Sequence, residues 1–341
     1  MTIKRFRISL AVLAVLTVVV FISAISIGRL NAEQPFDAIK SLFQAMGVDA
    51  GVSTVVFNYI VLLRLPRVLT TLLVGAGLAV AGVGMQAVFK NPLAAPDTLG
   101  VSAGAGFGAA LSIILGLSSV FTQLFAFGFA ALAVGLSLLL AKGKSKSITN
   151  VILTGIVIAA VFSAGLSLIQ VLASPTDQLP RIVFWLMGSF SNSGYGTLIY
   201  LAPIVLLSMT VIIVLRWRIN VLMFSDNEAT TLGVKVRVLR VIIIICSTLI
   251  TATCVSAVGI IGWVGLVIPH ISRMIFGSNN RYVVPTSIFM GAIFITVIDT
   301  LSRVITPYEL PISIITALVG APIFLILLRI KRKYSINAES D

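Results

Sequence analysis

Apolar runs of about 20 residues recur along this chain, separated by short polar segments. A run of that length is long enough to cross the hydrocarbon core of a bilayer as an α-helix. Charged residues make up only 10% of the 341 residues, whereas soluble domains carry roughly a quarter. The pattern therefore predicts an all-α polytopic membrane protein and excludes a set of soluble domains.

The runs predict about ten transmembrane helices in one domain covering residues 1–341. The expected helices are 6–27, 65–89, 99–117, 120–141, 148–172, 198–215, 241–260, 262–276, 282–305 and 312–330. Helix 262–276 is short and interrupted by Pro269, which is tolerated only where protein shields the freed backbone groups. The first helix lacks a small-residue cleavage site after it, so we expect it to be retained rather than removed as a signal peptide.

The formal net charge is +13, which in a soluble protein would point to nucleic acid. Most of the 24 Lys and Arg residues, however, lie at the two chain ends, after helix 120–141 and in the connection 216–240. The positive-inside rule explains this bias and predicts that these segments face the cytoplasm. Nucleic acid is therefore not an expected partner. Arg64, Arg67 and Arg303 are exceptions, because they fall near the outer ends of their helices.

The sequence lacks several of the residue patterns that mark catalytic and metal-binding sites. Because His270 is the only histidine, neither a multi-histidine metal site nor a Ser-His-Asp arrangement on an apolar segment is expected. No G-x-x-x-x-G-K-[ST] loop is present, so the chain is not expected to hydrolyse ATP. Cys246 and Cys254 lie in one apolar run about 12 Å apart along a helix, too far for a disulfide. We predict a non-catalytic protein that binds no metal or cofactor itself.

Stretch 64–106 carries the most distinctive motif. It begins Arg64-Leu-Pro-Arg67, runs through an uncharged glycine-containing segment to Met85-Gln86, turns at Asn91-Pro92-Leu-Ala, and ends in Leu99-Gly100-Val101 and further glycines. Repeated small residues let helix backbones approach closely in a membrane. On spacing alone, the stretch is also typical of an ordinary glycine-rich hairpin in a polytopic protein.

Two later motifs accompany this stretch. Gly259-Ile-Ile-Gly262-Trp-Val-Gly265 leads to Pro269-His270-Ile-Ser-Arg273, and Glu309-Leu-Pro311-Ile precedes Gly320-Ala-Pro322. Together the motifs resemble the FecCD type of permease subunit, found in ABC importers for iron–siderophores, haem and cobalamin. The resemblance covers nearly the whole chain, with Trp263 for the usual phenylalanine and one residue fewer before Glu309. The positions matching the family's structural motifs are Asn91, Pro92, Gly100, Gly262, Gly265, Pro269, His270, Arg273, Glu309, Pro311, Gly320 and Pro322.

The resemblance implies a type II ABC importer permease in the cytoplasmic membrane of a bacterium. It also implies the partners: a second permease, either another copy or a similar chain, two cytoplasmic ATPase subunits that carry ATP and Mg²⁺, and an extracytoplasmic substrate-binding protein. A ferric siderophore is the expected substrate because the family mostly carries such chelates, with haem and cobalamin left open. An ion-coupled secondary transporter is the alternative class, but it needs ionisable residues at the midplane, and only Asp299 comes near.

The connection 216–240 contains the candidate coupling element. Asp226-Asn227 is expected to cap a short helix that Gly233 ends, although a solvated amphipathic loop fits the same pattern. The family has E-x-A-x-x-L-G here, and this chain has Glu228-Ala229-Thr-Thr-Leu232-Gly233, with the alanine shifted by one position. The resemblance implies that Asp226, Glu228, Ala229, Leu232 and Gly233 couple the permease to the ATPase.

The outer face and the inner gate complete the candidate sites. Arg64, Arg67 and Arg303 match family arginines that pair with carboxylates of the binding protein; snorkelling anchors are the alternative. Asp299 lies four positions before Arg303 on one helix and is expected to orient it. Helices 148–172 and 312–330 would border the pathway, with the gate near Lys146, Ser147, Ile148, Thr149 and Asn150.

Overall fold

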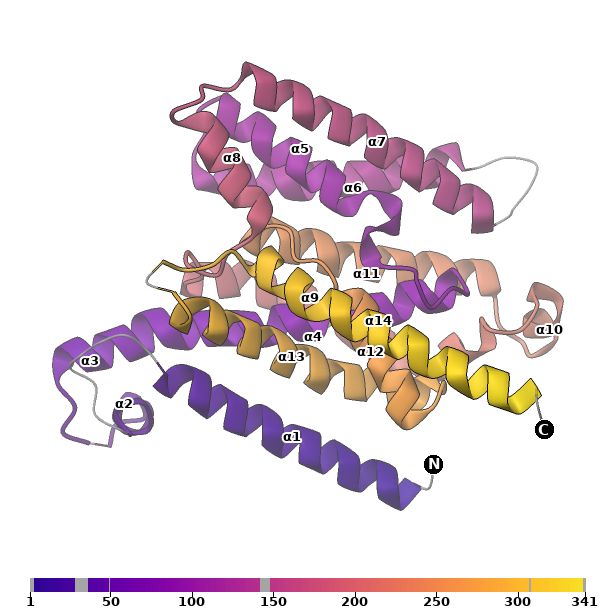
Figure 1. Cartoon of the computed structure of the whole chain (residues 1–341), viewed down its shortest axis with the longest axis horizontal. Coiled ribbons are helices and arrows are strands. Elements are labelled where there is room, and N and C mark those ends of the chain that lie inside the picture. The colour runs from indigo at the N-terminus through magenta and orange to yellow at the C-terminus, as the bar shows by residue number, and fades with distance from the viewer. Residues whose placement is uncertain (1–2, 28–35, 49, 142–147, 307, 340–341) are drawn as a thin grey trace.

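The computed structural model of the chain describes residues 3–27, 36–48, 50–141, 148–306 and 308–339. These residues form helices joined by short connections (Figure 1). The helices are α1 (Ile3–Ser26), α2 (Asp37–Ala45), α3 (Thr54–Asn58), η1 (Tyr59–Arg64), α4 (Leu65–Val88), η2 (Pro96–Leu99), α5 (Val101–Ile114), α6 (Ser119–Leu140), α7 (Ile148–Leu172), α8 (Gln178–Met187), α9 (Tyr195–Val221), α10 (Asp226–Thr231), α11 (Val236–Val258), α12 (Val264–Phe276), α13 (Asn280–Val304) and α14 (Ile312–Glu339).

Within the described residues, seven helical segments are long and apolar enough to cross a membrane. One of them is continuous from Thr54 to Val88, because α3, η1 and α4 follow one another without a break. Three shorter apolar helices, Val101–Ile114, Val264–Phe276 and Ile312–Leu327, complete the set. The prediction of an all-α polytopic membrane fold with about ten helices is confirmed.

Several helix ends differ from the expected ones. Helix α9 continues to Val221 and α11 begins at Val236, so the connection between them is shorter than the expected 216–240. Helix α8, which the apolar runs do not predict, begins at Gln178 and has Pro180 in its first turn. Proline is tolerated there because the first N–H groups of a helix have no partner within the helix.

Helix α4 lies at the centre of the molecule and packs against α9, α11, α12 and α13 (Figure 1). Its glycines make this close packing possible. A Cβ atom on Gly82 would overlap the carbonyl of Gly265 in α12, and one on Gly75 would overlap the carbonyl of Gly291 in α13. The backbones therefore touch directly, as the small-residue pattern of the sequence predicts.

The two ends of the molecule differ in composition. Helix α10 and the ends of the chain lie at one end of the bundle, while α2, α3 and α8 lie at the other (Figure 1). The basic segments around α10 and at both chain ends therefore share one side, which the positive-inside rule assigns to the cytoplasm. We call the α10 end the inner end and the α2 end the outer end.

This assignment predicts the labelling of single cysteines. Asp177→Cys, in the exposed segment before α8, should react with an impermeant maleimide added to intact cells. Lys235→Cys, at the exposed start of α11, should react only after the cells are permeabilised. Both variants need a Cys246→Ser, Cys254→Ser background, which removes the two buried native thiols. Labelling of Lys235→Cys in intact cells would contradict the assignment.

Candidate functional site

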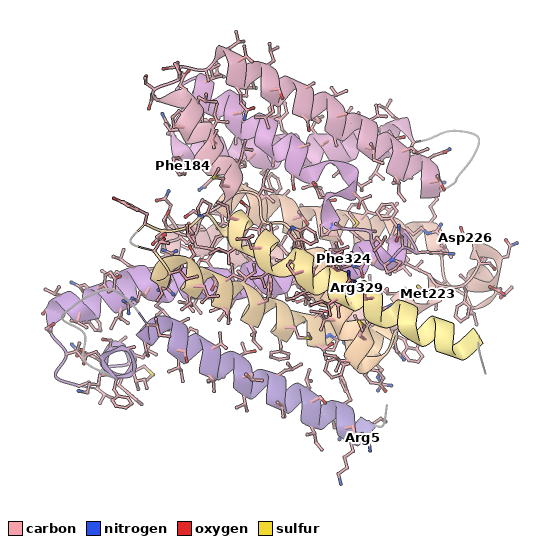
Figure 2. The ribbon with its side chains drawn as sticks, in the orientation of Figure 1. Arg5, Phe184, Met223, Asp226, Phe324 and Arg329 are labelled. Atoms are coloured by element: carbon pink, nitrogen blue, oxygen red, sulfur yellow. The ribbon has the colours of Figure 1, made fainter. Side chains whose placement is uncertain are left out.

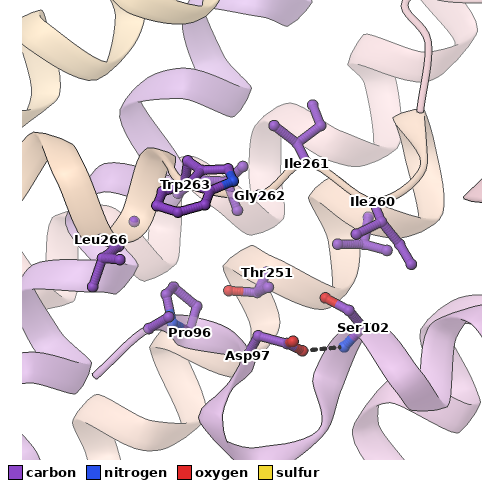
Figure 3. A pocket seen from close by; sticks show the side chains of 13 residues that line it. Pro96, Asp97, Ser102, Thr251, Ile260, Ile261, Gly262, Trp263 and Leu266 are labelled. Carbon is purple, nitrogen blue, oxygen red and sulfur yellow. Dashed lines mark hydrogen bonds between the residues drawn. The ribbon is translucent and has the colours of Figure 1, made fainter. Parts of the chain in front are cut away.

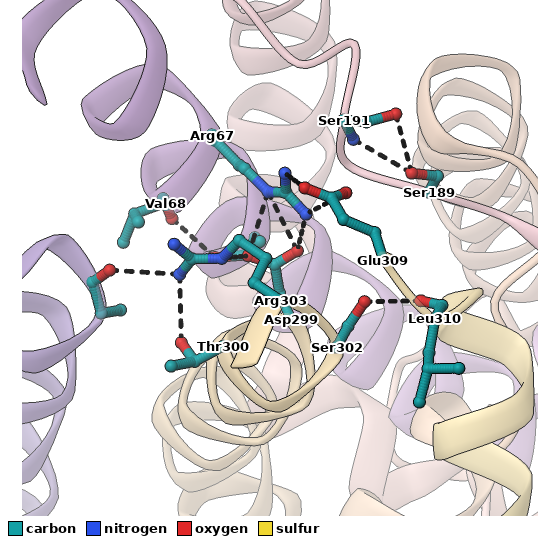
Figure 4. A network of polar contacts seen from close by, with 12 residues as sticks. Arg67, Val68, Ser189, Ser191, Asp299, Thr300, Ser302, Arg303, Glu309 and Leu310 are labelled. Carbon is teal, nitrogen blue, oxygen red and sulfur yellow. Dashed lines mark hydrogen bonds and ion pairs between the residues drawn. The ribbon is translucent and has the colours of Figure 1, made fainter. Parts of the chain in front are cut away.

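At the outer end, Arg67 holds two carboxylates at once (Figure 4). Its Nη2 lies 2.8 Å from Oδ1 of Asp299, and its Nη1 lies 2.8 Å from Oε1 of Glu309. A second contact, from Nη2 to Oε2 of Glu309 at 3.0 Å, makes the latter pair bidentate. Only 1% of the Asp299 side chain is exposed, against 39% of Glu309. Arg67 therefore ties α4 to α13 and to the segment that leads into α14.

Arg303 and Arg64 bind the end of α1. Nε of Arg303 pairs with Asp299 at 3.2 Å, as the four-residue spacing predicts, and its Nη2 donates to the carbonyl of Ala24 at 3.1 Å. Nη1 of Arg64 donates to the carbonyl of Ile25 at 2.8 Å. The last carbonyls of a helix lack partners within the helix and carry partial negative charge. The two guanidinium groups therefore cap the outer end of α1.

The three arginines thus lie inside the protein, with 3–9% of each residue exposed. They do not extend along the membrane surface as snorkelling side chains would. We call Arg64, Arg67, Asp299, Arg303 and Glu309 the outer charge cluster. The docking role of the three arginines stays a prediction, and the structure adds a role for the cluster within the chain, namely joining α1, α4, α13 and the start of α14.

Motifs far apart in the sequence meet at the inner half of the bundle. Nη1 of Arg273 donates to Oε1 of Gln86, so the Met85-Gln86 motif of α4 is bonded to the Pro269–Arg273 motif of α12. The amide nitrogen of Gln86 in turn lies 3.4 Å from the carbonyl of Gly265. Gly265 itself packs against the ring of Pro96. Hydrogen bonds therefore join α4 to α12, and an apolar contact joins α12 to the turn that begins at Asn91-Pro92.

The remaining motif residues lie around α14. Trp263 has a φ of 71°, in the left-handed region that a bulky side chain rarely occupies, and its ring packs on Gly320. Its ring also contacts that of Phe324, which in turn contacts His270 at 5.8 Å between ring centroids. His270 is buried. Pro269 and Pro322 lie inside α12 and α14, and Glu309-Leu-Pro311 leads into α14.

The expected gate is only partly described. Lys146 and Ser147 lie outside the described residues. Ile148 is the first residue of α7, Thr149 is exposed, and the carbonyl of Asn150 accepts a hydrogen bond from Thr154. The gate assignment stays a prediction.

The coupling element at the inner end is a single capped turn of helix. Ser225, not the expected Asp226, is the N-cap: its Oγ accepts from the backbone N–H of Glu228, and Glu228 Oε2 accepts from the N–H of Ser225 at 2.9 Å. This reciprocal arrangement is a capping box. The Ser-x-x-Glu spacing that predicts it is present in the sequence and was missed because the adjacent Asp226-Asn227 pair also fits a cap.

Asp226 instead anchors α10 to the rest of the inner end. Its carboxylate receives two bonds from Arg240 of α11, at 2.6 and 2.9 Å, and lies 3.8 Å from Nζ of Lys90. The hydrogen bonds from Arg240 lower the pKa of Asp226, and those from Ser225 lower the pKa of Glu228. Both carboxylates are therefore ionised at neutral pH. Nζ of Lys90 also donates to the carbonyl of Phe224 at 2.6 Å, which links the end of α4 to the coupling element.

Three large apolar side chains are exposed beside the polar residues of the coupling element, at the end of the molecule. Met223, Phe224 and Leu232 are each more than half exposed, and Met223 and Asp226 project at the α10 end in Figure 2. Ala229 is buried beneath them. Gly233 has a φ of 77°, the left-handed conformation that the sequence predicts for the residue ending the helix. An exposed apolar patch of this kind beside a rigid turn is typical of a protein-binding surface.

Gly233→Val tests the coupling role that the family resemblance implies for this turn. A β-branched residue is strained at a φ of 77°, so the turn after α10 will change course while the membrane helices stay unaffected. Substrate uptake should fall at least tenfold, with normal amounts of protein in the membrane. Gly194→Val is the matched control, because a Cβ there meets open space and φ lies outside the left-handed region. Unchanged uptake in Gly233→Val would contradict a coupling role for this turn.

Comparison with known proteins now adds to this geometry. Residues 14–330 match the model of the FecCD transport family. The chain is 39% identical to the molybdate import system permease protein MolB of Haemophilus influenzae, over 94% of this chain and 95% of that one. It is 36% identical to a probable iron chelatin transport system permease protein of Helicobacter pylori, over 95% of this chain and 98% of the other.

A solved structure of a transporter is also similar to this chain. A metal-chelate type ABC transporter in an inward-facing conformation superimposes with a TM-score of 0.85 and 37% sequence identity, covering 94% of this chain and 98% of that one. The family match, the apolar helices and this fold together identify the class of the protein. The chain belongs to the FecCD transport family and is a multi-pass permease subunit of an ABC importer in the bacterial inner membrane.

Proposed function

We propose that this permease carries a ferric chelate, such as a ferric siderophore, inward across the membrane. The permease contributes no chemistry of its own in this proposal. It supplies inward- and outward-facing states, and ATP binding to a separate subunit shifts their populations. A second permease, another copy or a similar chain, completes the pathway, and a binding protein delivers the substrate to the outer end.

The coupling element is the observation that carries this proposal. A channel or an ion-coupled transporter has no need of a rigid turn that exposes apolar side chains at its inner end. Here the turn is capped by Ser225 and Glu228, fixed to α11 through Asp226 and Arg240, and presents Phe224 and Leu232 outward. These features suit a surface that docks on a separate ATPase subunit and transmits its motion to the helices.

The proposed substrate class rests on the names of relatives. One relative is described as an iron chelatin permease, and the structural neighbour as a metal-chelate type transporter. Molybdate is the second candidate, because the relative from Haemophilus influenzae is described as a molybdate permease. Among the described residues, no group of three or more His, Cys, Asp or Glu side chains could hold a bare metal ion. The proposed cargo is therefore a whole chelate recognised first by the binding protein.

Growth of a deletion strain tests the proposal. Under iron starvation, with single ferric siderophores as the only iron source, the strain should fail to grow on at least one chelate and recover when the gene is restored. Cobalamin, haem and molybdate are supplied in parallel to strains that depend on each. A defect confined to one of these three compounds would overturn the ferric chelate proposal. A normal response to all compounds would overturn the importer itself.

A further inference from the structure

A cavity of about 240 Å³ lies in the middle of the bundle (Figure 3). Its floor is the turn that ends in Pro96 and Asp97, and its roof is the irregular segment that precedes α12, including Gly262 and Trp263. The first turn of α5 contributes Ser102. None of these segments is in the middle of a membrane-spanning helix, because α5 and α12 both begin at this cavity.

The starts of these two short helices have the same backbone feature. Gly100, before α5, has a φ of 79°, and Trp263, before α12, has a φ of 71°. Such conformations persist in bulky residues only where the surrounding structure imposes them, and they cluster at functional sites. Broken helices that begin near the middle of the membrane are also where transporters place substrate sites. The cavity is therefore a candidate contact point for the substrate.

The cavity lies between the two helices expected to border the pathway. On one side, Trp263 packs on Gly320 of α14. On the other, η2 packs against α7, where a Cβ on Gly155 would come within 2.6 Å of the carbonyl of Thr98. Segments that line the cavity therefore adjoin both α7 and α14.

Asp97 is the one ionisable residue among those that line the cavity. Its Oδ1 accepts a 2.7 Å hydrogen bond from the backbone N–H of Ser102, in the first turn of α5. A helix start is partially positive and attracts anions, but here the carboxylate already occupies that position. Thr251 and Ser102 add hydroxyl groups, and the rest of the lining is mostly apolar. The only group in the lining that can carry a charge is therefore a carboxylate, which makes the cavity negative when it is ionised.

We propose that Asp97 is a specificity-determining residue that excludes oxyanions such as molybdate and admits neutral or cationic chelates. This inference rests on the proposed function and narrows its substrate class. Size alone cannot exclude molybdate, because 240 Å³ holds a small oxyanion whole but only one arm of a chelate. Charge can do so. A carboxylate about 5 Å from an anion, at an effective dielectric constant of about 20, disfavours it on the order of a hundredfold.

Thiol reactivity tests the charge of the cavity without any transport. Gly262→Cys is introduced into the Cys246→Ser, Cys254→Ser background, because a Cβ at position 262 meets open space. Its reaction rates are measured in the purified protein with a cationic trimethylammonium thiosulfonate and an anionic sulfonate thiosulfonate of similar size. The cationic reagent should react at least tenfold faster. Adding Asp97→Asn should reduce that ratio at least fivefold.

Two further cysteines serve as controls. Ser102→Cys should show the same preference and the same loss with Asp97→Asn, because it lies beside the carboxylate. At Ser118→Cys, an exposed position just before α6, the ratio should not respond to Asp97→Asn. A ratio that is unchanged by Asp97→Asn at positions 102 and 262 would overturn the proposal. So would the absence of any reaction at both positions, because the proposal requires an accessible cavity.

Uptake assays separate this inference from the proposed function. The permease with its ATPase and binding protein is reconstituted in vesicles and offered a neutral ferric chelate and molybdate. The wild type should import the chelate at least tenfold faster than molybdate. Efficient molybdate import by the wild type would overturn both the substrate class and the role of Asp97. A failed thiol test combined with chelate import would overturn the role of Asp97 alone.

Discussion

Gly82→Ala should destabilise the permease although it adds only one methyl group. The new Cβ would overlap the carbonyl of Gly265, so α4 and α12 could no longer touch. Overpacking of a filled interior lowers the free energy of unfolding by about 1–3 kcal/mol. The backbone of Gly265, unlike a side chain, cannot relieve the overlap by changing rotamer. The expected result is a clear fall in the temperature at which the purified protein aggregates in detergent. Gly75→Ala should act in the same way through Gly291.

Gly128→Ala is the matched control for both variants. Gly128 lies in the middle of α6, and a Cβ there meets nothing within 4 Å. Alanine is favoured over glycine in a helix interior by about 1 kcal/mol, so this variant should be neutral or slightly more stable. If Gly82→Ala and Gly128→Ala behave alike, the direct contact between α4 and α12 is not important for stability.

Arg67→Ala should have the second large effect, by leaving the buried carboxylate of Asp299 short of a partner. Only 1% of the Asp299 side chain is exposed, and Arg303 alone would remain to pair with it. Removing one partner of a buried ion pair costs about 3–5 kcal/mol. The amount of folded permease in the membrane should therefore fall strongly. Arg67→Lys should rescue only part of the loss, because an ammonium group cannot bind Glu309 in the bidentate manner seen here.

Arg181→Ala is the control, since it breaks the exposed pair with Asp177, whose side chain is 70% exposed. Exposed pairs contribute about 0–1 kcal/mol, so the protein level should stay normal. The surviving Arg67→Ala protein also tests docking. Weaker affinity for the binding protein at equal protein amounts would support a docking role as well. Unchanged affinity for the binding protein would show that the outer charge cluster serves only to hold the helices together. A normal level of Arg67→Ala protein would contradict that structural role.

The sequence predicted the helices well because their apolar length is a local property, set by the thickness of the bilayer. It located the inner ends of α9 and α11 poorly. Arg216 and Arg218 favour the start of a loop, yet α9 continues through them to Val221, because long basic side chains are compatible with a helix that emerges from the membrane. Hydropathy measures where the membrane ends and not where the helix ends.

The contacts within the candidate sites were less predictable. The pairing of Arg303 with Asp299 follows from four-residue spacing on one helix. The pairing of Arg67 with Glu309 joins residues 242 positions apart, and no local pattern indicates it. The bond between Gln86 and Arg273 is of the same kind. In the sequence Asp97 is only one residue of a polar turn, and its surroundings are evident only in the structure, where α5 and α12 begin at the same cavity.

The shortness of α5 and α12 has a consequence for how the protein is made. Helix α12 has 13 residues and is therefore about 20 Å long, well below the roughly 30 Å of the hydrocarbon core. Such a segment is poorly suited to enter the bilayer by itself as it leaves the ribosome. Helix α12 packs on the surface of α4 around Gly82. That part of α4 is synthesised about 180 residues before α12. The first half of the chain must therefore be inserted in the membrane with this surface of α4 still uncovered. Biogenesis depends on α4 as the template on which the second half packs.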